Sequence, residues 1–555
     1  MPPPLPVDDD APQIIRAYHA RTQHHVYSYA RALGYLDWAA QPDPFRRYTD
    51  AARVPLPLLR PDGMAEGSVR WPDVCAGRVP PAAVNLASIA QLFEDSLALS
   101  AWKKAGSNRW ALRVNPSSGN LHPTEGYLVC GPVSGLSDTA AVWHYAPDEH
   151  ALERRATLPN EVWQAIARDV PADALLLGLT SIAWREAWKY GERAYRYCMH
   201  DVGHALGALG YAAATLGWKA TLVPLADAKL AALLGVDDEA GAPEAEHPDC
   251  LVVIHRDAGA HATWVRGFDL DDRTLTALRG VVWHGTPNQL SREHHAWPLI
   301  DDAIAATRLA RAAPSACFDR TGSAVPTPAP VPDACARTLF RQRRSAVAMD
   351  GKTGTDALTF FAMLQRATDP LAPPLALLPW RSRVHLLLFV HRVTGIPPGI
   401  YCLVRGGRDP AWVRARMRKE FMWERAAGVP TDLPLFLLVP IDCKALAQSV
   451  SCQQAIAGDS AFALGMLTEF APTLAAFGAW GWRLLHWEAG AIGQLLYLEA
   501  EAAGLRATGI GCFFDSAVHE AVGIGDDDLR TIYHFTTGGA VDDERLQTEP
   551  AYPGR

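Results

Sequence analysis

The chain has 555 residues, of which 49% are hydrophobic and 20% charged, and its formal net charge at pH 7 is −8. This composition is that of an ordinary globular enzyme, and the length predicts at least two domains. The acidic balance argues against a nucleic-acid-binding protein, which needs a basic face to neutralise phosphates.

The N-terminal stretch MPPPLPVDDDAPQ has neither a basic region nor an apolar core, so we expect no signal peptide. The most apolar runs, Val384–Val390 and Leu433–Val439, are too short to span a bilayer and are predicted to be buried strands. Ten cysteines are scattered without a CxxC pair, which is typical of reduced thiols rather than of structural zinc. We therefore expect a soluble cytoplasmic protein with no metal, no membrane association and no nucleic-acid partner.

The first candidate site in chain order is the segment NPSSGNLHP, Asn115–Pro123, which lies between an amphipathic helix predicted from Leu86 and an apolar run ending at Cys130. Serine hydroxyls and an asparagine amide both donate and accept hydrogen bonds, as a polar ligand requires. Pro, Ser, Gly and Asn also favour turns for local reasons. Composition alone therefore leaves a ligand-binding loop and a plain turn both open.

Next comes a long segment that occurs twice. KYGERAYRYCMHDVGHALGALGYAAATLGWKAT, from Lys189, aligns without a gap with AFGAWGWRLLHWEAGAIGQLLYLEAEAAGLRAT, from Ala476, at an offset of 287 residues. The matched pairs include Arg196 with Arg483, Asp201 with Glu488, Gly203 with Gly490, and Gly217 with Gly504. Each copy is predicted to be one long helix that begins near the acidic residue. Small and apolar residues on more than one face indicate burial and close helix packing.

Between the two copies, TGSAVPTPAPVPDACAR at Thr321–Arg337 is typical of an extended linker. We divide the chain into a first domain at 1–312, a linker at 313–337 and a second domain at 338–555. Each half is predicted to contain a helix, strands, the long helix, a strand and a helix. This order indicates an α+β fold, with an antiparallel-rich sheet flanked by helices. The repeat predicts a tandem duplication fused as an intramolecular pseudo-dimer.

Three further motifs carry candidate chemistry. Lys189-Tyr190 precedes the first long helix and could handle a proton, or Lys189 could be a surface residue paired with Glu186 or Glu192. Arg343-Arg344-Ser345, predicted at a helix start, suits a phosphate monoester, although a solvated basic cap has the same composition. GIGCFF, Gly509–Phe514, permits close approach of a planar ring to the backbone, or is a strand edge with glycine bends.

Together, NPSSGNLHPTEGYLV, WREAWKYGERAYRY, RRSAVAMDG, VHRVTGIPPGIY and EAGAIGQLLYLEAEAAGLRATGIGCFF resemble the nitroreductase superfamily of flavoproteins, in its SagB-type dehydrogenase branch. The resemblance implies noncovalent FMN at a dimer interface. It implies phosphate contacts from Arg343, Arg344 and Ser345 and, more loosely, from Arg545. It implies that Pro116, Ser117, Ser118 and Asn120 line the flavin from the partner half. It implies that the backbone of Gly509, Gly511, Cys512 and Phe513 faces flavin N5.

Lys189-Tyr190 resembles a pair in azoline-oxidising members, which implies that it handles the proton while hydride passes to the flavin. The first half lacks the RRS motif, and the second half lacks the PSSGN and Lys-Tyr motifs. We therefore expect one FMN per chain.

The predicted function is an FMN-dependent oxidoreductase or dehydrogenase acting on a small or peptide-derived substrate. An NAD(P)H-dependent nitroreductase-like flavin reductase and a flavin-binding scaffold without turnover remain alternatives. The substrate, the use of NAD(P)H, a peptide-modifying partner and assembly beyond the monomeric pseudo-dimer stay open.

Overall fold

The structure is a computed structural model that describes residues 10–59, 69–236, 242–256, 265, 267–311, 313, 315–320, 325–426 and 428–554. Most of the N-terminal stretch, residues 1–9, and residues 321–324 of the predicted linker lie outside the described residues. Among the helices that are described, none has the length and apolarity needed to cross a bilayer.

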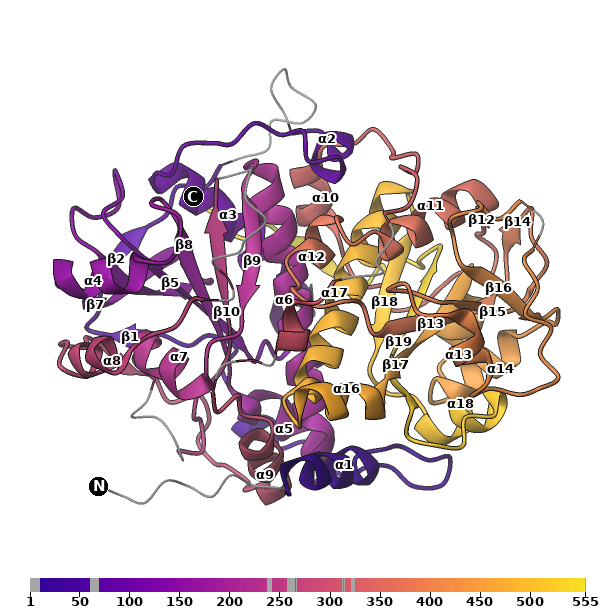
Figure 1. Ribbon diagram of the computed structural model, residues 1–555. Helices are drawn as coiled ribbons and strands as arrows, with labels where there is room; N and C mark the ends of the chain where they lie inside the picture. Colours follow the sequence, from indigo (N-terminus) through magenta and orange to yellow (C-terminus); the bar gives the residue numbers. More distant parts are fainter. Residues whose placement is uncertain are drawn as a thin grey trace.

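Two antiparallel sheets lie on opposite sides of a central layer of helices (Figure 1). The first sheet has the order β2-β7-β6-β5-β8-β10-β9. Its strands are β2 (Ala52–Pro55), β5 (Thr124–Cys130), β6 (Ala141–Ala146), β7 (Ala151–Thr157), β8 (Leu175–Ser181), β9 (Lys219–Val223) and β10 (His247–His255). The second has the order β16-β15-β13-β17-β19-β18. Its strands are β13 (Val384–Val390), β15 (Gly399–Leu403), β16 (Leu435–Val439), β17 (Phe462–Glu469), β18 (Arg506–Ile510) and β19 (Leu529–Gly538).

The two halves have the same topology. In chain order, β5 to β10 of the first sheet take the same relative places as the six strands of the second sheet. The long helices, α6 (Ala194–Thr215) and α17 (Gly481–Ala502), and the strands that follow them, β9 and β18, begin and end 287 residues apart. The runs Val384–Val390 and Leu433–Val439 do form strands, β13 and β16, as predicted.

The long helices α6 and α17 pack against each other at the centre of the molecule (Figure 1). Only Ala214 in α6 and Ala502 in α17 are not buried, which agrees with the lack of a polar face in the sequence. A Cβ atom added to Gly203 would lie 2.5 Å from the carbonyl oxygen of Trp487 and 2.8 Å from the Cα atom of Gly490. The two backbones therefore touch at a pair of glycines. Both helices begin seven residues before the acidic residue, so the predicted start was too late.

Shorter helices surround this centre, and capping residues fix where several of them begin. Asn85 accepts a hydrogen bond from the backbone N–H of Ser88 and completes a capping box at α3 (Leu86–Glu94). Asp356 caps α11 (Ala357–Thr368), because its side chain accepts a hydrogen bond from the backbone N–H of Thr359. The other α-helices are α1 (Ala11–Arg21), α2 (Trp71–Cys75), α4 (Asn160–Ala167), α5 (Ala183–Tyr190), α7 (Asp227–Leu234), α8 (Asp272–Arg279), α9 (Pro298–Ala306), α10 (Ala336–Gln342), α12 (Pro373–Ala376), α13 (Pro410–Arg414), α14 (Lys444–Val450), α15 (Ala455–Asp459), α16 (Phe470–Phe477) and α18 (Asp515–Val522).

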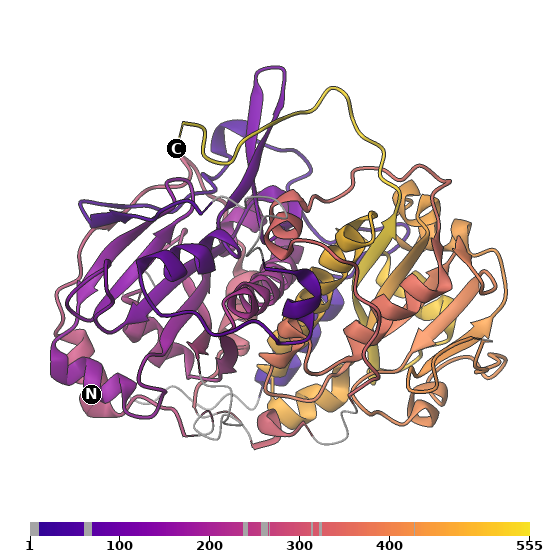
Figure 2. The ribbon, with the colours of Figure 1, turned by 90° about the horizontal axis from the view of Figure 1, so that it is seen from above.

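Both ends of the described chain cross to the opposite half. Figure 2 shows the C-terminal segment running from the second half to the first. There β20 (Gln547–Glu549) pairs with β3 (Leu99–Ala105), which pairs in turn with β4 (Asn108–Arg113). At the other end, α1 packs on α9, and the segment after α1 reaches α18, where His24 N donates to Asp515 Oδ2 at 3.1 Å. The remaining small sheets pair β1 (Tyr48–Thr49) with β11 (Thr286–Pro287), and β12 (Thr355–Asp356) with β14 (Val393–Thr394).

Candidate functional site

The PSSGN loop, Pro116–Asn120, follows β4 and is held on the first long helix. The backbone N–H of Ser118 donates to Asp201 Oδ1 at 3.1 Å, and the Ser118 hydroxyl donates to the same oxygen at 3.2 Å. Asn120 Nδ2 donates to the carbonyl oxygen of Ala111 at 2.6 Å. The residue between them, Gly119, has a φ of 58°, which suits glycine. Part of the loop's hydrogen-bonding capacity is therefore used to shape the loop itself.

Lys189 and Tyr190 end α5 directly against this loop. A Cβ atom added to Gly119 would lie 2.5 Å from the Tyr190 hydroxyl and 3.1 Å from Lys189 Nζ. The ring of Tyr190 lies 4.5 Å from the ring of Tyr197, whose hydroxyl donates to the carbonyl oxygen of Gly511 at 3.3 Å. The structure thus links the loop, the Lys-Tyr pair and the second half through one continuous set of contacts.

The alternative ion pairs for Lys189 do not form. Glu192 pairs instead with Arg21 at 3.1 Å and with Arg31 at 3.8 Å. Among the carboxylates that the structure describes, none lies within ion-pair distance of Lys189 Nζ. Glu186 lies near enough to interact electrostatically with the Lys189 ammonium. Lys189 is half-buried and keeps its amine at the loop.

The glycine segment, Gly509–Phe513, connects β18 to α18 in the second half. The Gly509 N–H donates to the hydroxyl of Tyr497 at 2.9 Å, and that hydroxyl lies 2.8 Å from Ser345 Oγ. A Cβ atom added to Gly511 would lie 2.3 Å from the Tyr197 ring. The phosphate motif and the glycine segment are therefore neighbours, as the resemblance implies, and Tyr497 is a contact that the sequence did not indicate.

Arg343 and Arg344 reach from the second half to the first. Arg343 Nη2 donates to the carbonyl oxygen of Arg113 at 3.1 Å, two residues before the loop sequence that starts at Asn115. Arg344 donates to Ser100 Oγ at 3.3 Å and to the Ser100 carbonyl oxygen at 3.2 Å. The predicted helix start is wrong, because α10 ends at Gln342 and the motif follows its C-terminus. The helix dipole there opposes an anion, so only the guanidinium groups could attract a phosphate.

The Arg343 guanidinium is buried and that of Arg344 is half-buried, and the carboxylate that acts on both, Glu501, pairs with Arg506 instead. Neither forms an ion pair within 4 Å of a carboxylate among the described residues. Burial lowers the pKa of Arg343, and burial together with Arg343 lowers that of Arg344 to about 10. Two adjacent cations held away from carboxylates are a site for an anion.

The donor set fits FMN. Arg343 Nε and Asn115 Oδ1 are buried without a hydrogen-bond partner in the described structure, and they lie on opposite halves. Neither Gly509 nor Gly511 has room for a side chain, since a Cβ atom on Gly509 would lie 1.9 Å from the Tyr533 hydroxyl. An anionic phosphate at the arginines and a polar ribityl chain at the loop would match this set.

Two buried carboxyl groups at the loop are features that the motif analysis did not assign. Asp201 accepts from the loop, and burial raises its pKa to about 7. Glu186 Oε1 accepts weakly from Ser117 Oγ at 3.5 Å, and burial, with Asp201 nearby, raises its pKa well above the ordinary value. The glutamate lies three residues before Lys189 on α5, so helical spacing places it near the pair.

Arg545 does not join this site. Its side chain is 87% exposed and pairs with Asp543 at 2.7 Å. Among the described residues, no three His, Cys, Asp or Glu side chains gather as a metal-binding group.

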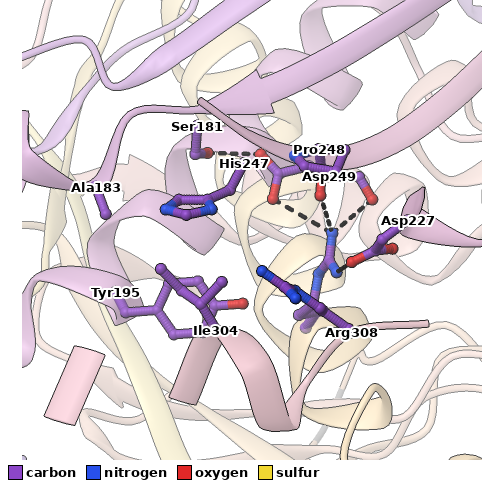
Figure 3. A pocket seen from close by; sticks show the side chains of 10 residues that line it. Ser181, Ala183, Tyr195, Asp227, His247, Pro248, Asp249, Ile304 and Arg308 are labelled. Atoms are coloured by element: carbon purple, nitrogen blue, oxygen red, sulfur yellow. Dashed lines mark hydrogen bonds and ion pairs between the residues drawn. The ribbon is translucent and has the colours of Figure 1, made fainter. Parts of the chain in front are cut away.

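A second region between the two halves, at the start of α7, contains a buried ion pair. Beside the start of α7, Arg483 pairs with Asp227 at 2.6 Å, as Arg196 pairs with Asp515 at 3.0 Å at the start of α18. Figure 3 shows the pocket here, where Asp249, Tyr195 and neighbouring side chains surround this ion pair. The cavity measures about 10 Å³, which is room for roughly one water molecule. The pocket is too small for a flavin ring.

Comparison with known proteins finds a family match for part of the first half and a similar fold for the whole chain. Residues 81–254, which include the PSSGN loop, Lys189-Tyr190 and α6, match the model of the nitroreductase family. No curated protein matches the chain.

A candidate nitroreductase from Anabaena variabilis has a similar fold, with a TM-score of 0.67 at 21% identity over 95% of this chain and 99% of that one. A candidate nitroreductase from Ralstonia eutropha has a TM-score of 0.27 at 16% identity, covering 41% of this chain and 98% of its own. A chain of the E. coli microcin synthetase McbBCD complex has a TM-score of 0.27 at 18% identity, covering 46% and 95%. The first likeness shows a nitroreductase-like α+β fold, and the other two are too weak to carry an argument.

Proposed function

We propose that the chain is an FMN-dependent oxidoreductase that holds one FMN between its two halves. The proposal is carried by one observation: buried Arg343 and half-buried Arg344 have no carboxylate in direct contact, and both reach across to the first half, Arg343 to Arg113 just before the PSSGN loop and Arg344 to Ser100. The family match of residues 81–254 supports flavin as the ligand. The shared topology and the 287-residue offset support an origin by tandem duplication, with the chain as a pseudo-dimer.

The residues that would hold FMN come from both halves. Arg343, Arg344 and Ser345 would bind the phosphate. The PSSGN loop would provide polar contacts to the ribityl chain and ring edge from the first half. The backbone of the glycine segment would lie near the ring, as the resemblance implies. The Gly509 N–H is already donated to Tyr497, so the contact to the ring would come from the residues after it, Gly511 to Phe513. When bound, FMN supplies a hydride acceptor, which no side chain of the protein can provide.

Lys189 and Tyr190 would move the proton in this reaction. The Lys189 amine and the Tyr190 hydroxyl both face Gly119 of the loop, and no described carboxylate forms an ion pair with the amine. Burial raises the pKa of Glu186 beside them, which favours the neutral acid and weakens any ion pair with the lysine. This arrangement favours a dehydrogenase of the SagB type, acting on a small or peptide-derived substrate, over an NAD(P)H-driven reductase.

The test is to titrate the purified chain with FMN and to measure binding by the quenching of flavin fluorescence. We expect saturable binding, and we expect Ser118→Leu to abolish it, because the leucine side chain cannot replace the hydroxyl that holds the loop on Asp201 and would displace the loop from α6. Thr139→Leu, in an exposed turn of the same half, is the control and should bind FMN normally. A chain that binds no FMN, or a Ser118→Leu variant with unchanged affinity, would contradict the proposal.

A further inference from the structure

Two cysteines meet at the edge of the glycine segment. Cys512 belongs to that segment, and Cys452 lies in the turn between α14 and α15. Their sulfur atoms are 2.7 Å apart. Seven of the ten cysteines are buried, whereas these two and Cys75 are partly exposed. The pair is therefore the one place in the described structure where two accessible thiols face each other.

The backbone holds the two thiols together. The Phe514 N–H donates to the carbonyl oxygen of Val450 at 2.8 Å, and Gln454 Nε2 donates to the carbonyl oxygen of Cys512 at 2.9 Å. Cys452 has a φ of 54°, a left-handed conformation that residues other than glycine rarely adopt. Strain of this kind at a reactive side chain is a sign of a functional position.

The surroundings of Cys512 favour a thiolate. His24 Nδ1 accepts a hydrogen bond from the backbone N–H of Ala30 at 2.9 Å, so its proton lies on Nε2, which faces the Cys512 sulfur. Arg193 Nη2 donates to the carbonyl oxygen of Gly511 at 3.0 Å and brings a positive charge next to it.

The hydrogen bond from Cys452, then that from His24, lowers the pKa of Cys512 below the ordinary thiol value, against the effect of burial. The other titratable groups near the two sulfurs are Asp515, Tyr29, Tyr190 and Tyr197.

We propose that Cys512 and Cys452 form a thiol–disulfide exchange site whose substrate is a low-molecular-weight disulfide. The Cys512 thiolate attacks one sulfur of the disulfide, forms a mixed disulfide and releases the first thiolate. Cys452 then loses its proton and attacks Cys512 Sγ, which releases the second thiolate. The small disulfide gains two electrons and two protons and becomes two thiols, while the protein thiols lose them and become one disulfide. This chemistry is distinct from the proposed flavin reaction and does not require bound FMN.

The experiment treats the full-length chain with oxidised glutathione, blocks the remaining thiols and maps the peptides by mass spectrometry. The wild-type chain should lose two alkylatable thiols and yield a peptide linked through Cys452 and Cys512. Cys452→Ser should instead retain glutathione on Cys512, since the second attack is removed. Cys75→Ser is the matched control and should behave as the wild type does.

A second measurement keeps the proposal testable if a variant fails to fold. In the reduced wild-type chain, iodoacetamide should modify Cys512 at least about tenfold faster than Cys75, because only Cys512 has a large thiolate fraction at neutral pH. The proposal is overturned if the oxidised wild-type chain keeps all its thiols or pairs other cysteines. Glutathione found on Cys452 in Cys512→Ser, with none on Cys512 in Cys452→Ser, would also overturn the assigned order of attack.

Discussion

At the residue scale, the account depends on two arginines at the interface of the halves, Arg343 and Arg344, that no carboxylate contacts directly. We predict that Arg344→Gln weakens FMN binding by roughly 10- to 100-fold, which corresponds to the loss of a charge-assisted contact. Riboflavin, which lacks the phosphate, should bind the variant and the wild type about equally. Fluorescence titration with both ligands measures the difference.

The control for this change is Arg341→Gln. Arg341 lies three residues earlier, at the end of α10, and pairs with Glu94 at 2.6 Å. It should leave the affinity for both ligands unchanged. Equal weakening of FMN and riboflavin in Arg344→Gln would mean that the arginine supports the fold of the cleft and does not bind a phosphate.

A second prediction at this scale concerns Asp201. Its pKa is about 7 in the folded chain, whereas an unfolded aspartate titrates near 4. Between these values the folded state binds more protons, so this carboxyl lowers the free energy of unfolding as pH rises from about 4 to 7. In Asp201→Asn this contribution disappears. Urea unfolding at pH values from 5 to 8 should show that the free energy of unfolding falls less with rising pH in the variant than in the wild type. Parallel curves would contradict the assigned titration.

The residues of the site were only partly predictable. The RRS motif, the PSSGN loop and Lys189-Tyr190 are local patterns that sequence can show, and the structure places them near one another. The direction of α10 was misread because a basic cluster carries no sign of which helix end it occupies. The raised pKa values of Glu186 and Asp201 depend on burial by distant segments, so no local pattern reveals them.

At the scale of elements, the packing of α6 against α17 depends on a close approach of the two backbones at Gly203 and Gly490. We predict that Gly203→Ala lowers the free energy of unfolding by about 1–3 kcal/mol, since the new Cβ atom would lie 2.5 Å from the Trp487 carbonyl oxygen and backbone cannot move aside. Alanine favours a helix by about 1 kcal/mol over glycine, which offsets only part of this cost. Gly525→Ala is the control, because its Cβ atom would meet nothing within 4 Å. Chemical denaturation that ranks the two variants equally would contradict the close packing.

Long elements were the easier ones to predict. Twenty-two-residue helices with small residues on several faces leave a strong pattern, and β13 and β16 are continuous apolar runs. The starts of α6 and α17 were misplaced because no capping residue precedes either helix: the residue at the N-cap is Arg193 or Trp480, and the structure shows no side-chain cap at either.

At the scale of the whole molecule, the halves depend on each other. We predict that residues 1–320 or 325–555, expressed alone, do not form a stable monomer, because each would expose the buried face of its long helix to water. Co-expression of the two pieces should restore one complex by size-exclusion chromatography. A half that is monomeric, with cooperative thermal unfolding of its own, would contradict this dependence.

The repeat in the sequence predicted two similar halves, and the topology of the two sheets agrees with it. The crossing of the chain ends, with the segment after α1 on α18 and β20 on β3, was not predicted. Short terminal segments carry too few residues to show where they pack, and their positions depend on surfaces that exist only after the halves have assembled.

The central claim is that the two halves complete a single flavin site. The RRS motif and the glycine segment belong to the second half, and the PSSGN loop and Lys189-Tyr190 belong to the first. The most direct test is the molar ratio of FMN to protein after saturation and removal of free ligand, measured by absorbance and by mass spectrometry of the intact complex. The account predicts a ratio of one, and a ratio of two would contradict it.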